Sequence, residues 1–195
     1  EMLTQLTGLS HWKGTASVLP ALGRLPVLKG GTIYILDKPD ATQSVIKIGK
    51  RSLPWDATGN FFKSYLMNYP LGGAFNSRIN LNLREDKGYT YGARSYFSGG
   101  SEVGLFEAKA SVRTNVTSQA LVEFVKEIKQ YQSSGVTDEE LNFMKASVSQ
   151  GKALKYETPY QKAGFMRLIQ RYELEADFTV LQTEITNNIT KVELN

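Results

Sequence analysis

The segment that most constrains the fold of this chain runs from Leu71 to Ser98, with the sequence LGGAFNSRINLNLREDKGYTYGARSYFS. The pair Gly72–Gly73 interrupts the element that precedes it. Apolar residues then recur at helical spacing, at Phe75, Ile79 and Leu83. Gly88 stands where a glycine caps the C-terminus of a helix, and a run rich in Tyr, Thr and Phe follows, which is typical of a strand. The segment therefore predicts a helix, a turn and a strand.

Two polar side chains flank this predicted turn. Arg84 lies at the end of the helix beside the acidic pair Glu85–Asp86, and Tyr91 lies at the start of the strand. Taken singly, Arg84 is explained by an ion pair with its acidic neighbours and Tyr91 by packing within the strand. Because they flank the same turn, the two side chains can project to the same end of the fold.

The remaining pattern predicts two strands, two helices, two strands and then about four helices. We expect strands at 32–36, 44–51, 89–98 and 103–112, the first two and the last two pairing as hairpins. Helix starts are marked by Asp56 as a candidate N-cap, by Thr137 with Glu140, and by Thr158 with Pro159 and Gln161. We predict an α+β two-layer domain, in which an antiparallel-rich sheet packs against helices. Residues 1–28 are expected to be a lead-in linker, and residues 29–195 a single domain.

Composition narrows the class of protein further. The chain has 195 residues, 41% of them hydrophobic, which suits one globular domain with a real core. No apolar run is long enough to cross a membrane, so we expect no transmembrane helix, and Glu1–Thr7 shows no signal-peptide pattern. The net charge is +4, but the basic residues are dispersed, so nucleic-acid binding is kept only as a third alternative. The absence of Cys fits a periplasmic or a cytoplasmic protein, and an extracytoplasmic bacterial location is preferred.

The Leu71–Ser98 segment resembles the second-domain motif of the insulinase/pitrilysin-like zinc metallopeptidases, the family that includes mitochondrial processing peptidase. The positions that match are Leu71, Gly72, Gly73, Ser77, Arg78, Arg84, Glu85, Gly88 and Tyr91. The resemblance covers about residues 30 to 195, and implies a domain built like those of processing peptidases.

The zinc motif of that family, His-x-x-Glu-His, is absent from this chain. The sequence contains one histidine, His11, and no Cys, whereas a catalytic zinc site needs three protein ligands. The resemblance therefore implies a C-terminal domain without zinc or another cofactor of its own, with zinc on a partner domain or subunit. We expect this chain alone to be inactive as a peptidase.

The resemblance also implies roles for individual residues in peptide hydrolysis. Arg84 and Tyr91 would assist the zinc site of the partner, with the Tyr91 hydroxyl stabilising the oxyanion and Arg84 holding the substrate. Arg78 and Arg94 are candidate substrate-binding residues. The alternative is a catalytically inactive scaffold or assembly domain of the same family, which would not depend on Arg84 and Tyr91.

Overall fold

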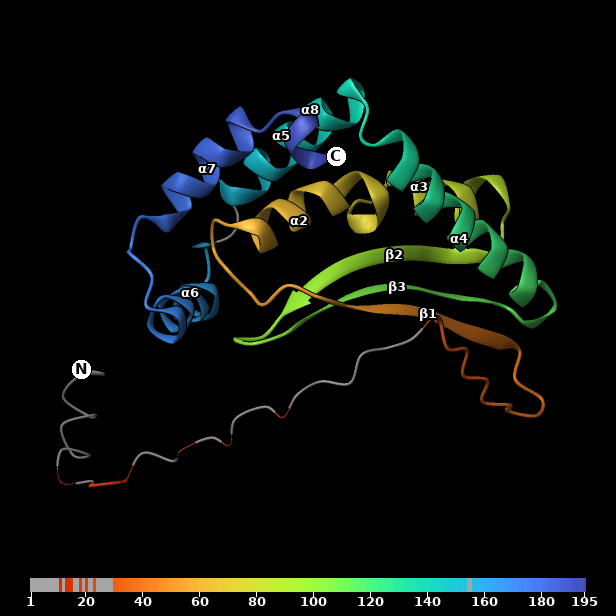
Figure 1. Ribbon diagram of the computed structural model, residues 1–195, viewed down its shortest axis with the longest axis horizontal. Coiled ribbons are helices and arrows are strands. Elements are labelled where there is room, and N and C mark those ends of the chain that lie inside the picture. The colour runs from red at the N-terminus through yellow and green to blue at the C-terminus, as the bar shows by residue number, and fades with distance from the viewer. Residues whose placement is uncertain are drawn as a thin grey trace. The chain divides into compact units, whose positions relative to one another are not determined.

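A computed structural model of the chain describes residues 11, 13–15, 18, 20, 23, 30–153 and 156–195. The chain separates into two units, Glu1–Lys38 and Pro39–Asn195. Among the residues that the structure describes, helices and strands occur only in the second unit (Figure 1). The unit boundary lies ten residues beyond the predicted end of the linker at residue 28, and the assignment of residues 29–38 to the domain stays a prediction.

Three antiparallel strands form the sheet of the second unit: β1 (Gln43–Ser52), β2 (Thr90–Gly99) and β3 (Gly104–Arg113). Their order is β1-β3-β2, so β3 is central and the other two are edge strands. The predicted hairpin at 89–98 and 103–112 is confirmed by the pairing of β2 with β3. Gly104, the first residue of β3, allows the chain after β1 to approach closely, because a Cβ atom there would overlap the Leu53 carbonyl.

The helical elements of this unit gather on one side of the sheet, with α2, α3 and α4 above the strands in Figure 1. They are α2 (Asn60–Asn68), the π-helical turns η2 (Tyr69–Gly73) and η3 (Leu81–Asp86), α3 (Arg78–Asn80), the 3-10 turn η4 (Thr114–Val116), α4 (Thr117–Ser134), α5 (Asp138–Ala153), α6 (Pro159–Tyr172), α7 (Phe178–Asn188) and α8 (Lys191–Leu194). This arrangement confirms the predicted α+β class, an antiparallel sheet packed against helices. No helix in residues 30–153 and 156–195 has the length and apolar character needed to cross a membrane.

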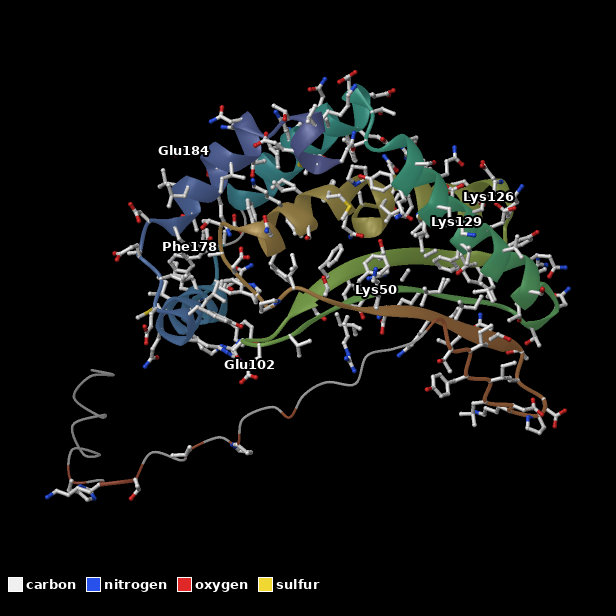
Figure 2. All side chains as sticks on the ribbon, in the orientation of Figure 1. Lys50, Glu102, Lys126, Lys129, Phe178 and Glu184 are labelled. Atoms are coloured by element: carbon white, nitrogen blue, oxygen red, sulfur yellow. The ribbon has the colours of Figure 1, made fainter. Side chains whose placement is uncertain are left out.

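The core lies between the sheet and these helices, where side chains fill the space between the ribbons (Figure 2). From α4, Phe124 is fully buried, whereas its neighbour Val125 is 38% exposed. The sheet contributes small residues, such as Ala108 and Ala110, which allow the helices to approach closely.

Two of the three predicted helix starts are confirmed. Asp56 is not an N-cap, because α2 begins at Asn60 and its N-cap is Gly59. Asp56 lies before the cap, where it accepts hydrogen bonds from the backbone amides of Gly59 and Phe61, at 2.5 and 3.0 Å. Reciprocal capping boxes join Thr137 to Glu140 and Thr158 to Gln161. The sequence predicts these capping boxes because a cap involves only residues that are close in sequence.

Two predicted elements are wrong. Residues 32–36 do not form a strand, and Ile33, Tyr34, Ile35 and Leu36 are 77–95% exposed. The reason is that a strand gains its stability from a pairing neighbour, and the sole partner that the structure gives β1 is β3. Phe75 is also misplaced: the helix begins at Arg78, and Phe75 lies in the preceding turn, 67% exposed.

Candidate functional site

The glycine pair of the motif brings the helical layer against the sheet. A Cβ atom on Gly72 would lie 2.5 Å from the backbone nitrogen of Ser95 and would overlap its side chain. Beside this contact, Asn68 and Ser95 exchange two buried hydrogen bonds, of 2.8 and 2.5 Å. Only glycine permits this approach, so Gly72 fixes the distance between η2 and β2.

Arg84 lies on η3, held at the surface by two contacts. Its guanidinium carbon lies 4.6 Å above the centre of the Phe75 ring, and Nη1 donates a 2.7 Å hydrogen bond to Glu85 Oε1. The exposed fraction of the Arg84 side chain is 34%. Within the part of the chain that the structure describes, Glu85 is the one acceptor of a side-chain hydrogen bond from Arg84, so most of its donors are open to a ligand. The exposed Phe75 thus serves as a platform for Arg84.

Tyr91 lies in a bulge of the edge strand β2. The pairing register with β3 shifts between Thr90 and Ala93, which leaves Tyr91 and Gly92 outside the ladder. Tyr91 is 92% exposed, and its hydroxyl bonds to no residue that the structure describes. The bulge is nevertheless well braced, because Thr90 Oγ1 donates to the Ser111 carbonyl at 2.6 Å and accepts from the Gly92 amide at 3.1 Å. A bulge of this kind re-aims a side chain without loosening the strand.

A buried asparagine that the sequence analysis missed connects these two positions. Asn80 is 4% exposed, and its Nδ2 donates to the Phe75 carbonyl at 2.8 Å while its Oδ1 accepts from the Ala93 amide at 2.9 Å. It therefore joins the platform of Arg84 to the bulge that carries Tyr91. The available signal was weak: an Asn in a predicted helix often bonds to nearby backbone.

The turn between the two candidate residues is fixed by backbone hydrogen bonds. The Gly88 amide donates to the Arg84 carbonyl at 3.2 Å, and the Tyr89 amide donates to the Leu83 carbonyl at 2.9 Å. Gly88 has a φ of +61°, the left-handed conformation that favours glycine. The geometry predicted from the sequence, a helix closed by Gly88 and followed by a strand, is thus present.

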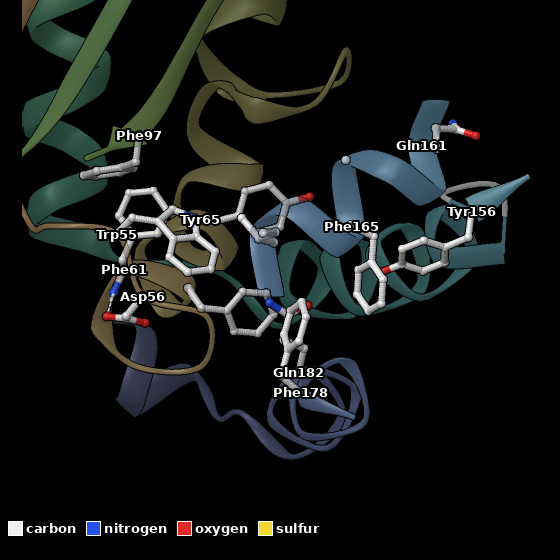
Figure 3. Close-up of a pocket in the computed structure, with 13 residues that line it drawn as sticks. Trp55, Asp56, Phe61, Tyr65, Phe97, Tyr156, Gln161, Phe165, Phe178 and Gln182 are labelled. Carbon is white, nitrogen blue, oxygen red and sulfur yellow. Dashed lines mark hydrogen bonds between the residues drawn. The ribbon is translucent and has the colours of Figure 1, made fainter. Parts of the chain in front are cut away.

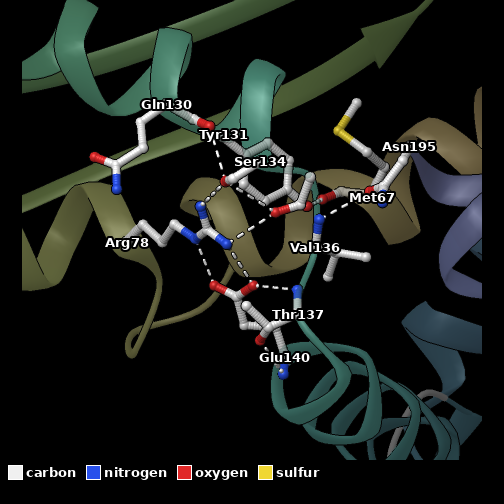
Figure 4. A network of polar contacts seen from close by, with 10 residues as sticks. Met67, Arg78, Gln130, Tyr131, Ser134, Val136, Thr137, Glu140 and Asn195 are labelled. Atoms are coloured by element: carbon white, nitrogen blue, oxygen red, sulfur yellow. Dashed lines mark hydrogen bonds and ion pairs between the residues drawn. The ribbon is translucent and has the colours of Figure 1, made fainter.

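The other motif arginine, Arg78, is engaged within the fold (Figure 4). It makes a two-pronged ion pair with Glu140, at 2.5 and 2.7 Å, and donates to the Gly135 carbonyl at 2.9 Å and to Ser134 Oγ at 3.2 Å. Its guanidinium carbon also lies 4.7 Å from the centre of the Tyr131 ring. Arg78 therefore ties α3 to the junction between α4 and α5.

The pKa shifts of Arg78 and Glu140 agree with a structural role for this ion pair. The hydrogen bond to Glu140 raises the pKa of Arg78 above its usual value. Burial alone would raise the pKa of Glu140, but the hydrogen bonds from Arg78 and Thr137 outweigh it, and the pKa is lowered. Desolvation raises the pKa of Tyr131, whose hydroxyl donates to the Met67 carbonyl at 2.7 Å. Both partners of the ion pair thus stay charged at neutral pH.

Arg94, the fourth candidate, stands apart from this cluster. It follows the bulge on β2, pairs in register with Lys109 and is exposed. Its guanidinium contacts no polar partner among the described residues. The predicted substrate-binding roles of Arg78 and Arg94 stay predictions.

A cavity of about 370 Å³ lies where α6 and α7 meet the start of α2 (Figure 3). Aromatic side chains dominate its wall: Trp55, Phe61, Phe62, Tyr65, Phe97, Tyr156, Phe165 and Phe178. Tyr65 of α2 is 45% exposed, so the aromatic wall of the cavity is partly open to solvent.

A zinc site does not fit the described residues. They contain no group of three His, Cys, Asp or Glu side chains that could hold a metal ion, and His11 is exposed. The fold and the motif together define an α+β domain in which Arg84 and Tyr91 flank a hydrogen-bonded turn.

A family model described as the peptidase M16 inactive domain matches residues 7–148, and the chain belongs to this family. An uncharacterised zinc protease of Streptomyces coelicolor is 29% identical over 122 residues, which cover 63% of this chain and 26% of that protein. The crystal structure of a peptidase M16 inactive domain from Pseudomonas fluorescens has a TM-score of 0.72 and 20% identity, covering 79% of this chain and 36% of that one. A protease from Helicobacter pylori has a TM-score of 0.69 and 16% identity, covering 80% of this chain and 38% of that one.

These comparisons confirm the resemblance to zinc peptidases and identify this chain with the inactive domain of the family. The chain spans about a quarter of the curated relative, and little more than a third of each of the two solved structures. An inactive domain of a zinc protease implies a peptidase partner domain.

Proposed function

We propose that this chain is the non-zinc domain of a zinc-dependent metalloendopeptidase, and that it closes a peptide-binding chamber opposite a zinc-bearing domain. That domain lies in the same polypeptide or in a second subunit, and its zinc supplies the hydrolytic chemistry. Two facts support the proposal: the chain belongs to the inactive-domain family, and its sequence has a single histidine and no Cys.

Tyr91 contributes to this chemistry by donating a hydrogen bond. When a peptide carbonyl is attacked, negative charge develops on its oxygen, and a donor already in place stabilises that charge. The Tyr91 hydroxyl is exposed and bonds to none of the residues in 30–153 and 156–195, so it is available as such a donor. This free hydroxyl on a braced bulge is the observation that carries the proposal.

Arg84 contributes by holding the substrate. A guanidinium is charged at every physiological pH and offers donors in a rigid plane, which suits peptide carbonyls and carboxylates. Stacking on Phe75 fixes the plane of the Arg84 group, and one bond to Glu85 leaves other donors for the peptide. Since Asn80 joins Phe75 to the bulge, Arg84 and Tyr91 keep a fixed relation while substrate binds.

The test is kinetic, on the enzyme reconstituted with its zinc-bearing domain or subunit. Tyr91→Phe removes one hydroxyl, so turnover should fall by about 100-fold while the Michaelis constant changes little. Arg84→Ala should weaken both substrate binding and turnover, and Arg84→Lys should not restore them fully, because the planar fork is lost. Zinc content and thermal unfolding of each variant serve as controls.

The competing function is a scaffold domain without a part in catalysis. Wild-type activity in both Tyr91→Phe and Arg84→Ala would establish that alternative and overturn the proposal. The chain alone should neither cleave peptides nor retain stoichiometric zinc after desalting, and tightly held zinc would contradict the assignment of the metal to a partner.

A further inference from the structure

The two faces of the sheet differ sharply in charge. Residues of each strand alternate between the core and the opposite side, which we call the outer face. The pairing register places Lys47 of β1, Lys109 of β3 and Arg94 of β2 next to one another on this face. Since neighbouring strands lie about 4.8 Å apart, the three cations form a row roughly 10 Å long across the whole sheet.

Further basic residues extend this row along the strands. The alternation that puts Lys47 and Lys109 on the outer face also puts Arg51 and Arg113 there, each four residues further along its strand. The outer face therefore carries five basic side chains and a single carboxylate, Glu107. These basic residues are dispersed in the sequence, and it is the register between distant strands that brings them together.

The carboxylate on this face is already engaged. Glu107 accepts a hydrogen bond from the Tyr96 hydroxyl and lies 3.7 Å from Lys109 Nζ, and the bond from Tyr96 is the main cause of its lowered pKa. Lys47 and Arg94, at the two ends of the row, form no hydrogen bond or ion pair with any described residue, and both are exposed. The charge of Lys47 also helps to lower the pKa of Glu107, but no described carboxylate is bonded to either end of the row.

No described helix of residues 39–195 covers this face, because α2, α3 and α4 lie on the other side of the sheet (Figure 1). Exposed apolar side chains stand among the cations: Val45 is 65% exposed and Leu105 is 40% exposed. A surface that mixes cations with apolar groups complements a chain that mixes carboxylates with apolar side chains.

We propose that the outer face of the sheet binds acidic segments of an extended polypeptide, with Lys47, Arg94 and Lys109 as its central contacts. The proposal rests on the proposed function in one respect, that the ligand is a peptide, and it gives the substrate class: peptides with acidic segments. Nucleic acid fits less well, because contacts to phosphates dominate its binding, whereas this face interleaves its cations with a carboxylate and apolar side chains.

Fluorescence anisotropy of the 195-residue chain with a labelled peptide of about 12 residues, Glu alternating with Ala and Ser, tests the proposal at about 50 mM salt. A matched peptide with Gln in place of Glu should bind at least about tenfold more weakly, and about 300 mM salt should remove most of that difference. Equal binding of the two peptides would overturn the proposal.

Two charge-matched double variants locate the site. Lys47→Glu with Arg94→Glu should reduce affinity for the acidic peptide by about tenfold or more, since it converts attraction to repulsion at both ends of the row. Lys126→Glu with Lys129→Glu makes the same change in net charge on α4, on the far side of the sheet (Figure 2), and should change affinity by less than about twofold. Equal losses in the two variants would show a net-charge effect alone and would overturn the proposed site.

Competition experiments distinguish a peptide ligand from nucleic acid and from a lipid surface. Generic double-stranded DNA, or vesicles with anionic lipid, should displace the acidic peptide only weakly, and stronger binding of either would reassign the face and overturn the peptide proposal. Tyr91→Phe should leave the anisotropy unchanged. A failure of the proposed catalytic function would therefore appear in turnover and not in this binding assay.

Discussion

Two arginines of the same motif, six residues apart, are used in opposite ways. Arg78 is 17% exposed and makes four hydrogen bonds to the junction of α4 and α5, whereas Arg84 is 34% exposed and makes one, to its own neighbour. Both match the family motif equally well. The comparison teaches that a motif fixes where a residue lies, while its hydrogen-bonding partners separate an architectural side chain from one that is free to bind a ligand.

The largest loss of folding stability is expected from a substitution in the core. Phe124 is fully buried on α4, the helix that also carries the Tyr131 and Ser134 contacts of Arg78. Phe124→Ala should lower the free energy of unfolding by about 3–5 kcal/mol, because it loses apolar burial and leaves a cavity. Chemical denaturation measures this loss, and a value below about 1 kcal/mol would show that the core face of α4 is misassigned.

Arg78→Met should give the next largest loss, about 2–3 kcal/mol, because it leaves the carboxylate of Glu140 without its cation and the Gly135 carbonyl without a donor. Methionine keeps the length of the side chain, so the loss reports on the polar contacts. The double variant with Glu140→Gln is the control, and it should be less destabilised than the sum of the two single variants. Additive losses would mean that the ion pair contributes little.

Asn80→Leu should cost about 1–2 kcal/mol, since the Ala93 amide and the Phe75 carbonyl both lose their partner. The more specific readout is native-state hydrogen exchange: the Ala93 amide should exchange faster, whereas the amide of Ala108, in the central strand, should not. Unchanged protection of Ala93 would rule out the link between the Arg84 platform and the Tyr91 bulge.

Lowering the pH should reduce the stability that the ion pair of Arg78 and Glu140 contributes. The pKa of Glu140 is lowered in the folded chain, so the stability it contributes is complete above its unfolded value near 4.5 and is lost as the pH falls through the folded value. Between pH 7 and pH 3, wild type should therefore lose more stability than Glu140→Gln. Parallel pH profiles of the two proteins would contradict this assignment.

Arg84→Ala should have the smallest effect on stability, below about 1 kcal/mol, because an exposed ion pair with a sequence neighbour contributes little. Denaturation of this variant beside Arg78→Met is the direct test of the comparison. A loss as large as that of Arg78→Met would remove the distinction between the two arginines.

Much of the fold could be predicted because its signals are local. The capping box of Thr158 and Gln161, the cap at Gly88 and the alternation in the second hairpin depend on residues close in sequence. The missing strand at 32–36 shows the limit: a run of apolar β-formers predicts a strand, but its formation depends on a partner elsewhere.

The motif predicts the residues of the candidate site, and their roles stay predictions. For Arg84 and Tyr91, the structure adds that a bulge exposes Tyr91. The bonds of Arg78 to Glu140, 62 residues away, and the row of Lys47, Lys109 and Arg94 depend on tertiary pairing. No short-range pattern carries that information.

The bulge at Tyr91 and Gly92 has a consequence for solubility. β2 is an edge strand, and an unbroken edge is a template on which a second copy of a protein adds strands and aggregates. By taking two residues out of the ladder, the bulge interrupts that template where a tyrosine is most exposed. The same irregularity thus exposes Tyr91 and should disfavour self-association through β2.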